Sequence, residues 1–163
     1  MSAATDFGET HAARLERVYD ELSAVLRDPD VARRMRAAPG EGEWSALQII
    51  GHMTEMIPYW LHHCQRLIAA GGAPPSFGRT PDSPERLAGV EQATTREPEE
   101  ALRLLHREVQ AAAEMIRSLS PADLGRKGAH IVRGEMTVGD VVSHFVVAHA
   151  EEHLAQVRAA LGA

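Results

Sequence analysis

Three histidines carry the clearest chemical signal in this sequence. His149 and His153 lie four residues apart in the segment His-Ala-Glu-Glu-His, and His52 lies far upstream. On a helix, four residues amount to about 40° of rotation and one turn of rise, so both imidazoles project from one strip. Two imidazoles placed in this way can bind one metal ion, and a third from another helix can complete one face of it.

The surroundings of the pair bear on whether it binds a metal or only packs. At about 100° per residue, the side chains within about 80° of His149 form an apolar stripe, namely Val138, Val141, Val142, Phe145, Val146, His153, Gln156 and Val157. His144 projects about 140° away, which predicts a surface position. Buried imidazoles need partners for both ring nitrogens, which a metal or ordinary core hydrogen bonds can supply. An inward third histidine favours the metal.

His52 lies on a strip of mixed character, shared with Ser45, Gln48, Met56, Tyr59 and His63. Such a strip suits the wall of a pocket better than a dry core. His63 is about 16 Å further along the helix, so we place it at a pocket rim. Glu55 is the nearest candidate for a fourth ligand. We predict a pocket beside the metal that is lined by Glu55, Met56, Tyr59, Trp60 and Gln156.

Composition narrows the class of protein. The chain has 163 residues, a net charge of −6 and 44% hydrophobic residues, which suits one globular domain over 1–163 and makes nucleic acid a poor partner. Cys64 is the only cysteine, so no internal disulfide can form. Neither a basic, apolar leader nor a stretch of about 20 apolar residues is present, so we expect a cytoplasmic protein without membrane contact.

Four long amphipathic segments must position these histidines, at about 6–27, 45–70, 98–119 and 137–161. Ser45 and Thr137 are the predicted N-caps of the second and fourth helices. Pro58 should bend the second helix. A short helix is predicted near 84–92, a turn near 31–35 and an irregular segment over 125–135, and no strong strand is apparent. The pattern predicts an all-α four-helix bundle with short extra helices in the connections.

The second predicted helix is apolar on two sides, whereas a helix in a single bundle needs only one buried face. Its surplus face is built around Leu47, Ile50, Ile57 and Leu61. We expect this face to be covered either by a second copy of the chain or by the short helices of the same chain.

The motif residues resemble those of the DinB-like (DinB/YfiT-type) family of metal-binding four-helix bundles. The resemblance rests on Trp44-Ser45 followed by His52, and on the block Thr137–Val157 with its histidine pair. It implies an up-down-down-up bundle, often a homodimer, with one divalent ion, zinc or nickel, held by His52, His149 and His153. Members include thiol-dependent transferases and isomerases. Ala150 stands where an acidic residue is frequent, so the partner that supports an imidazole is either lost or replaced by Glu55 or Gln156.

These features together predict a metal-dependent enzyme. The first hypothesis is a thiol-dependent transferase that uses a low-molecular-weight thiol and acts on a small-molecule adduct, with a hydrolase as the less favoured reaction. The alternative is a non-catalytic metal- or ligand-binding bundle, for example a stress-related protein. A third hypothesis keeps the histidines as core packing in a dimeric scaffold. The sequence identifies no catalytic base.

Overall fold

The computed structural model describes residues 3–162 and confirms the four-helix bundle. Residues 1–2 and 163 of the predicted domain lie outside the described residues. The long helices are α1 (Ala3–Val25), α3 (Ala46–Ala69), α5 (Pro98–Ser118) and a C-terminal helix made of α7 (Val138–Asp140), η1 (Val141–Ala148) and α8 (His149–Leu161). The connections contain the short helices α2 (Pro29–Arg33), α4 (Pro84–Ala93) and α6 (Pro121–Leu124).

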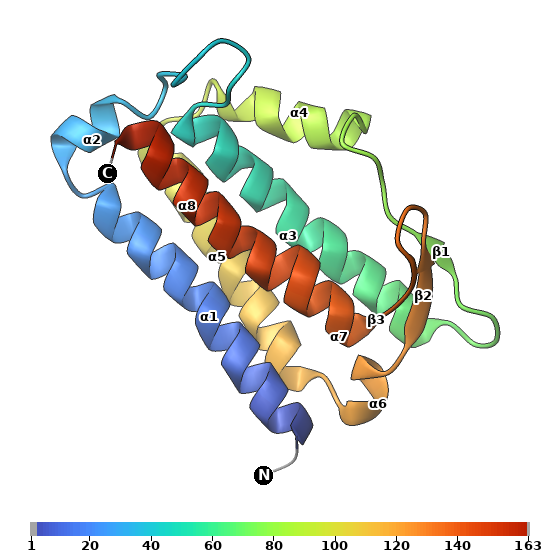
Figure 1. Cartoon of the computed structure of the whole chain (residues 1–163). Helices are drawn as coiled ribbons and strands as arrows, with labels where there is room; N and C mark the ends of the chain where they lie inside the picture. Colours follow the sequence, from blue (N-terminus) through green and yellow to red (C-terminus); the bar gives the residue numbers. More distant parts are fainter. Residues whose placement is uncertain (1–2, 163) are drawn as a thin grey trace.

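The helices follow an up-down-down-up order, as predicted (Figure 1). α1 and the C-terminal helix run in one direction, and α3 and α5 run in the other. Around the bundle, α1 packs on α5, α5 on α3, α3 on α8, and α8 on α1. The connection between the parallel helices α3 and α5 returns along the bundle and contains α4, which lies against α3.

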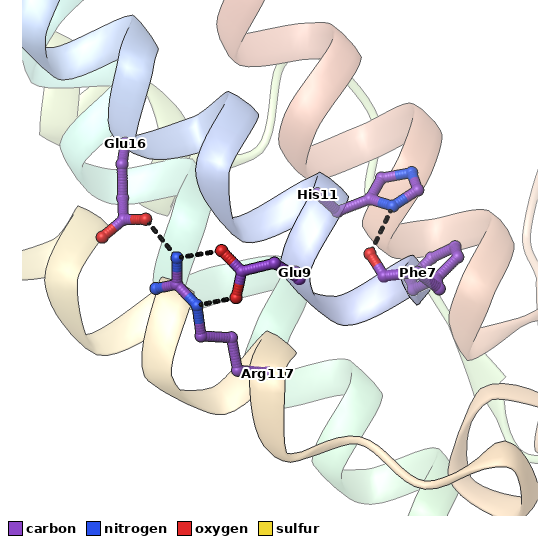
Figure 2. A network of polar contacts seen from close by, with 5 residues as sticks. All are labelled: Phe7, Glu9, His11, Glu16 and Arg117. Carbon is purple, nitrogen blue, oxygen red and sulfur yellow. Dashed lines mark hydrogen bonds and ion pairs between the residues drawn. The ribbon is translucent and has the colours of Figure 1, made fainter. Parts of the chain in front are cut away.

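α1 and α5 are also joined across their outer surface by a three-residue ion network, drawn in Figure 2. Arg117 Nε lies 2.8 Å from a carboxylate oxygen of Glu9, and Arg117 Nη2 lies 2.6 Å from one of Glu16. These side chains are partly exposed, so the network adds little to stability compared with the apolar core beneath it. It joins the N-terminal half of α1 to the end of α5.

α3 is the central helix of the molecule. Ser45 begins it with a capping box, in which the Ser45 side chain accepts from Gln48 N and the Gln48 side chain accepts from Ser45 N. The apolar face that exceeds the need of one bundle is covered within this chain: Leu47, Ile50, Ile57 and Leu61 are all buried. α4 packs so closely on α3 that a Cβ on Gly51 would lie 2.3 Å from Ala93 Cβ. This face therefore does not require a second copy of the chain.

The prediction of an irregular segment over 125–135 without strands was wrong. Strands β2 (Lys127–His130) and β3 (Gly134–Thr137) form an antiparallel hairpin, and β1 (Ser76–Phe77) pairs with β2 in parallel. Gly134 has a φ of 77°, a left-handed conformation that glycine adopts without strain. The strands are too short for a periodic apolar pattern to reveal them. They form a small three-stranded sheet at one end of the bundle (Figure 1).

The fourth helix begins at its predicted cap but is not α-helical throughout. The Thr137 side chain accepts from Asp140 N, and Asp140 accepts from Thr137 N, as the capping box predicts. Residues 141–148 then wind as a π-helix before α8 begins at His149. Val147 lies far from His149 on an ideal α-helical wheel, yet it is fully buried, and η1 packs against both α1 and α3. In residues 3–162, no helix is long and apolar enough to cross a membrane.

Candidate metal centre

The three histidines singled out by the sequence converge between α3 and α8. Each offers one ring nitrogen, and these nitrogens lie within 4.8 Å of one another. The ring centre of His52 is 4.8 Å from that of His153 and 5.9 Å from that of His149, and the pair itself is 4.4 Å apart. One turn of α8 stacks the pair, and the packing of α3 on α8 brings His52 to it.

The hydrogen bonds of these rings test whether a metal fits. His52 is buried, and neither of its ring nitrogens has a hydrogen-bond partner among residues 3–162; the same is true of His153 Nε2. Buried polar atoms without partners are rare, and each one needs an explanation. A divalent ion between the rings would accept one lone pair from His52 and one from His153 Nε2, so the residues present fit a metal. The observation also weighs against the hypothesis of ordinary core histidines, which should be hydrogen-bonded.

The protonation state of the rings suits the same role, because only a neutral imidazole can bind a metal. Burial lowers the pKa of His52 to about 3, with smaller contributions from the charges of His153 and Arg86. Burial likewise lowers the pKa of His153 to about 4, partly opposed by the hydrogen bond that the ring donates to Gln156. Burial also lowers the pKa of His149. At neutral pH all three rings are therefore uncharged.

Of the two residues predicted to support an imidazole, Gln156 does so and Glu55 does not. Gln156 Oε1 lies 2.8 Å from His153 Nδ1, so this nitrogen donates and Nε2 keeps its lone pair. Glu55 forms a bidentate ion pair with Arg79, at 2.5 and 2.6 Å. Glu55, the alternative as support or as a fourth ligand, is not among the groups that converge with the histidines, and its carboxylate is paired with a cation from the loop after β1.

The other predicted pocket residues, Met56, Tyr59 and Trp60, lie in different surroundings. Met56 is fully buried in the hydrophobic core, so its placement in a pocket wall was wrong. A helix that is apolar on most sides leaves the wheel unable to separate core from pocket at this position. The Tyr59 ring supports the Arg79 guanidinium, whose carbon lies 3.8 Å from the ring centre. Trp60 lines a hollow next to His149, as described below.

Two hollows reach the histidines. The first, which we call the C-terminal hollow, has a volume of about 620 Å³, and its wall includes His153. The residues that line it are Pro39, Gly42, Glu43, Trp44, Arg86, His153, Gln156, Ala159 and Ala160. Trp44 connects this hollow to the centre, because its ring lies 5.3 Å from that of His52. The prediction of Gln156 as a pocket residue agrees with this position.

The second, which we call the hairpin hollow, has a volume of about 410 Å³, and its wall includes His149. It is lined by Trp60, Arg79, Pro81, His130, Val132, Arg133, His144, Phe145, Ala148, His149 and Glu152. His144 is exposed, as predicted, although it also lies in this wall. Sequence reasoning did not identify Arg79, His130 or Arg133, because they belong to the loop and hairpin that it left without structure.

His63 and Cys64 lie outside the metal centre. His63 is half-buried, with Nδ1 3.0 Å from an Arg66 nitrogen, and burial lowers its pKa to about 4. Cys64 is fully buried, and burial raises the pKa of its thiol to about 12. A thiol in this state is inert as a nucleophile.

Comparisons with known proteins agree with the fold. A family model described as the DinB superfamily matches residues 14–157. The solved structure of YfiT from Bacillus subtilis, described as a probable metal-dependent hydrolase with an unusual four-helix bundle topology, is similar to this chain with a TM-score of 0.72. The two sequences are 16% identical, and the match covers 98% of this chain and 87% of that one. No curated protein matches the chain.

Proposed function

This chain belongs to the DinB superfamily, and from that premise we propose that it is a metal-dependent enzyme. The observation that carries the proposal is the convergence of His52, His149 and His153, together with buried nitrogens of His52 and His153 that have no hydrogen-bond partner among residues 3–162. These residues would hold one divalent ion, zinc or nickel, through three neutral imidazoles. Three protein ligands with an open position are typical of catalytic rather than structural sites.

When bound, such an ion acts as a Lewis acid that polarises a carbonyl or lowers the pKa of a thiol or water. The protein's own residues supply the rest of the arrangement. Gln156 fixes the orientation of the His153 ring, and the apolar core around His52 keeps that ring uncharged. Trp44 covers His52 on the side of the C-terminal hollow.

The two hollows favour group transfer between two reactants. One hollow includes His153 and the other includes His149, so two small molecules can approach the same centre through different openings. We therefore propose a thiol-dependent transferase, in which a low-molecular-weight thiol occupies one hollow and an electrophilic small molecule occupies the other. Hydrolysis is the second candidate reaction, because the similar structure of YfiT is described as that of a probable metal-dependent hydrolase.

The test begins with metal-free protein loaded with Co²⁺, whose absorption reports on its ligands. We expect one ion per chain and a new thiolate-to-metal band when a low-molecular-weight thiol is added. The His52→Ala variant should lose the ion, and His144→Ala should keep it. Failure of the wild type to bind any divalent ion would refute the metal centre. Binding without a thiol band, together with turnover of ester or amide substrates, would replace transfer by hydrolysis. Binding with neither would favour a non-catalytic bundle.

Location, assembly and partners stay predictions. We propose a cytoplasmic homodimer that acts on small molecules and binds neither nucleic acid nor membrane. The homodimer is supported by family resemblance, since the apolar face on α3 is covered within one chain. Sedimentation of the metal-loaded protein at tens of micromolar tests this proposal, and a monomer at that concentration would contradict it.

A further inference from the structure

Arg86 is the only lysine or arginine among the residues that line the C-terminal hollow. It lies on α4, and two contacts hold its guanidinium in place. Nη1 donates a hydrogen bond to the carbonyl of Pro81 at 2.6 Å, and the guanidinium carbon lies 5.0 Å from the centre of the Trp44 ring. An arginine stacked on an indole in this way has little freedom left to lose when a ligand binds.

No carboxylate neutralises Arg86. Among residues 3–162, no aspartate or glutamate oxygen lies within 4.0 Å of its nitrogens, although ten other ion pairs form. Arg79, in the hairpin hollow, is paired with Glu55 through both Nη1 and Nη2. Arg86 thus keeps both its positive charge and the donors that Pro81 does not use. A half-buried guanidinium in this state is a recognition group for a planar anion.

The position of Arg86 links this anion site to the metal centre. The Trp44 ring has the guanidinium beside it and the ring of His52 5.3 Å from its centre. His153 and Gln156 belong to the same hollow. A molecule whose anionic end meets Arg86 therefore has its other end directed along the indole ring toward the histidines.

We infer that the C-terminal hollow binds a small organic carboxylate, with Arg86 as the residue that determines this specificity. The inference rests on the proposed function, because the hollow serves the same centre. A carboxylate matches the paired donors of one guanidinium. Glu43 also lines the hollow, and Ala159 and Ala160 supply no donor side chains, which disfavours a multiply charged phosphate. The volume of about 620 Å³ lies within the range of small-molecule sites.

The two tryptophans of the chain allow the two hollows to be observed separately. Trp44 lines the C-terminal hollow and Trp60 lines the hairpin hollow, so their indole N–H resonances report on different sites. Metal-free protein is titrated with benzoate, with the neutral isostere benzamide and with inorganic phosphate. The absence of metal prevents the probe from binding to the ion, so this test does not depend on the metal centre. We expect benzoate to shift the Trp44 resonance, and benzamide and phosphate to have much weaker effects.

Arg86→Gln should weaken benzoate binding about tenfold or more, because it removes a charge-assisted hydrogen-bonding partner. Arg86→Lys should lie between this variant and the wild type, since it keeps the charge and loses the fork. Arg133→Gln, which removes a cation from the hairpin hollow, is the matched control and should bind as the wild type does. Thermal unfolding of each variant verifies that it is folded.

Three results would overturn the inference: equal shifts with benzoate and benzamide, unchanged affinity in folded Arg86→Gln, or a benzoate response at Trp60 without one at Trp44. Tighter binding of phosphate than of benzoate would overturn the choice of a carboxylate. Loss of the proposed metal centre would show itself separately, as failure of the wild type to bind Co²⁺.

Discussion

Gln156 holds His153 from one turn further along the same helix, with Gln156 Oε1 2.8 Å from His153 Nδ1. This hydrogen bond selects the tautomer in which Nε2 faces the other two imidazoles with a free lone pair. Ala150 has no acidic group with which to support an imidazole. Instead, the neutral amide of Gln156, on the solvent side of α8, supports the His153 ring.

The first prediction concerns this amide. Gln156→Leu should weaken zinc binding about tenfold to hundredfold, because His153 loses the partner that orients its ring. Competition with a chromophoric chelator measures the affinity. Gln156→Glu keeps an acceptor at the same position and should retain most of the binding. Unchanged affinity in Gln156→Leu would show that packing alone orients His153.

The second prediction separates two histidines that lie five residues apart in the same helix. His149→Ala should reduce zinc affinity by more than about hundredfold, since removal of a ligand costs more than removal of its support. His144→Ala should leave the affinity unchanged, because that side chain is exposed and is not one of the three converging rings. Equal loss in both variants, measured by the same competition assay, would contradict the assignment of ligands.

The third prediction follows from the lowered pKa of His52, about 3 in the folded protein against about 6.5 in an unfolded chain. The unfolded state therefore binds the additional proton first. The contribution to stability is complete above pH 6.5 and is lost as the pH falls toward 3.

Urea unfolding of metal-free protein from pH 7 to pH 5 should show this loss. His52 can contribute up to about 1.4 kcal/mol per pH unit to the slope within that window. His52→Gln should have a smaller slope, whereas His62→Gln, an exposed substitution on the same helix, serves as the control and should not. Identical slopes in wild type and His52→Gln would rule out the buried, neutral state of this ring.

The fourth prediction addresses the ion pair between Glu55 and Arg79, whose side chains are only 20% and 9% exposed. Arg79→Met should destabilise the protein by about 2 to 3 kcal/mol, because it leaves a largely buried carboxylate without a partner. The double variant Glu55→Gln/Arg79→Met should recover part of this loss.

Urea unfolding provides the free energies for this cycle. Arg103→Met, which removes one member of an exposed pair with Glu100, is the matched control and should cost less than about 1 kcal/mol. Strictly additive effects of the two site substitutions would show that Glu55 and Arg79 do not stabilise each other.

The sequence predicted the parts of this molecule that depend on long periodic patterns. The four helices, the caps at Ser45 and Thr137 and the convergence of the three histidines follow from spacing along a helix. Two predicted pocket residues, Glu55 and Met56, were misplaced because their surroundings depend on tertiary contacts. Glu55 is engaged by Arg79 from 24 residues away, and Met56 belongs to a helix surrounded by partners on most sides. Neither fact appears in a helical wheel.

The loop and hairpin show the same limit. Arg79, Arg86 and His130 are isolated residues in the sequence, without a partner at ligand spacing. They reach the site because α4 and the small sheet fold back beside α3. Contacts that close such long connections are set by the global arrangement of the chain, so local patterns could not reveal this part of the site.

The π-wound segment Val141–Ala148 has a consequence for how the centre tolerates changes in chain length. It lies between the fixed cap at Thr137 and the first ligand of the pair, so its winding sets the angular position of His149 and His153 relative to that cap. Deleting one residue from the segment can be absorbed by conversion of a wide turn to an α-helical one. The same deletion between His149 and His153 has no such reserve and would change their spacing from four residues to three. A change in chain length can therefore be absorbed on the N-terminal side of the histidine pair, in the π-helical segment, and not between the two histidines.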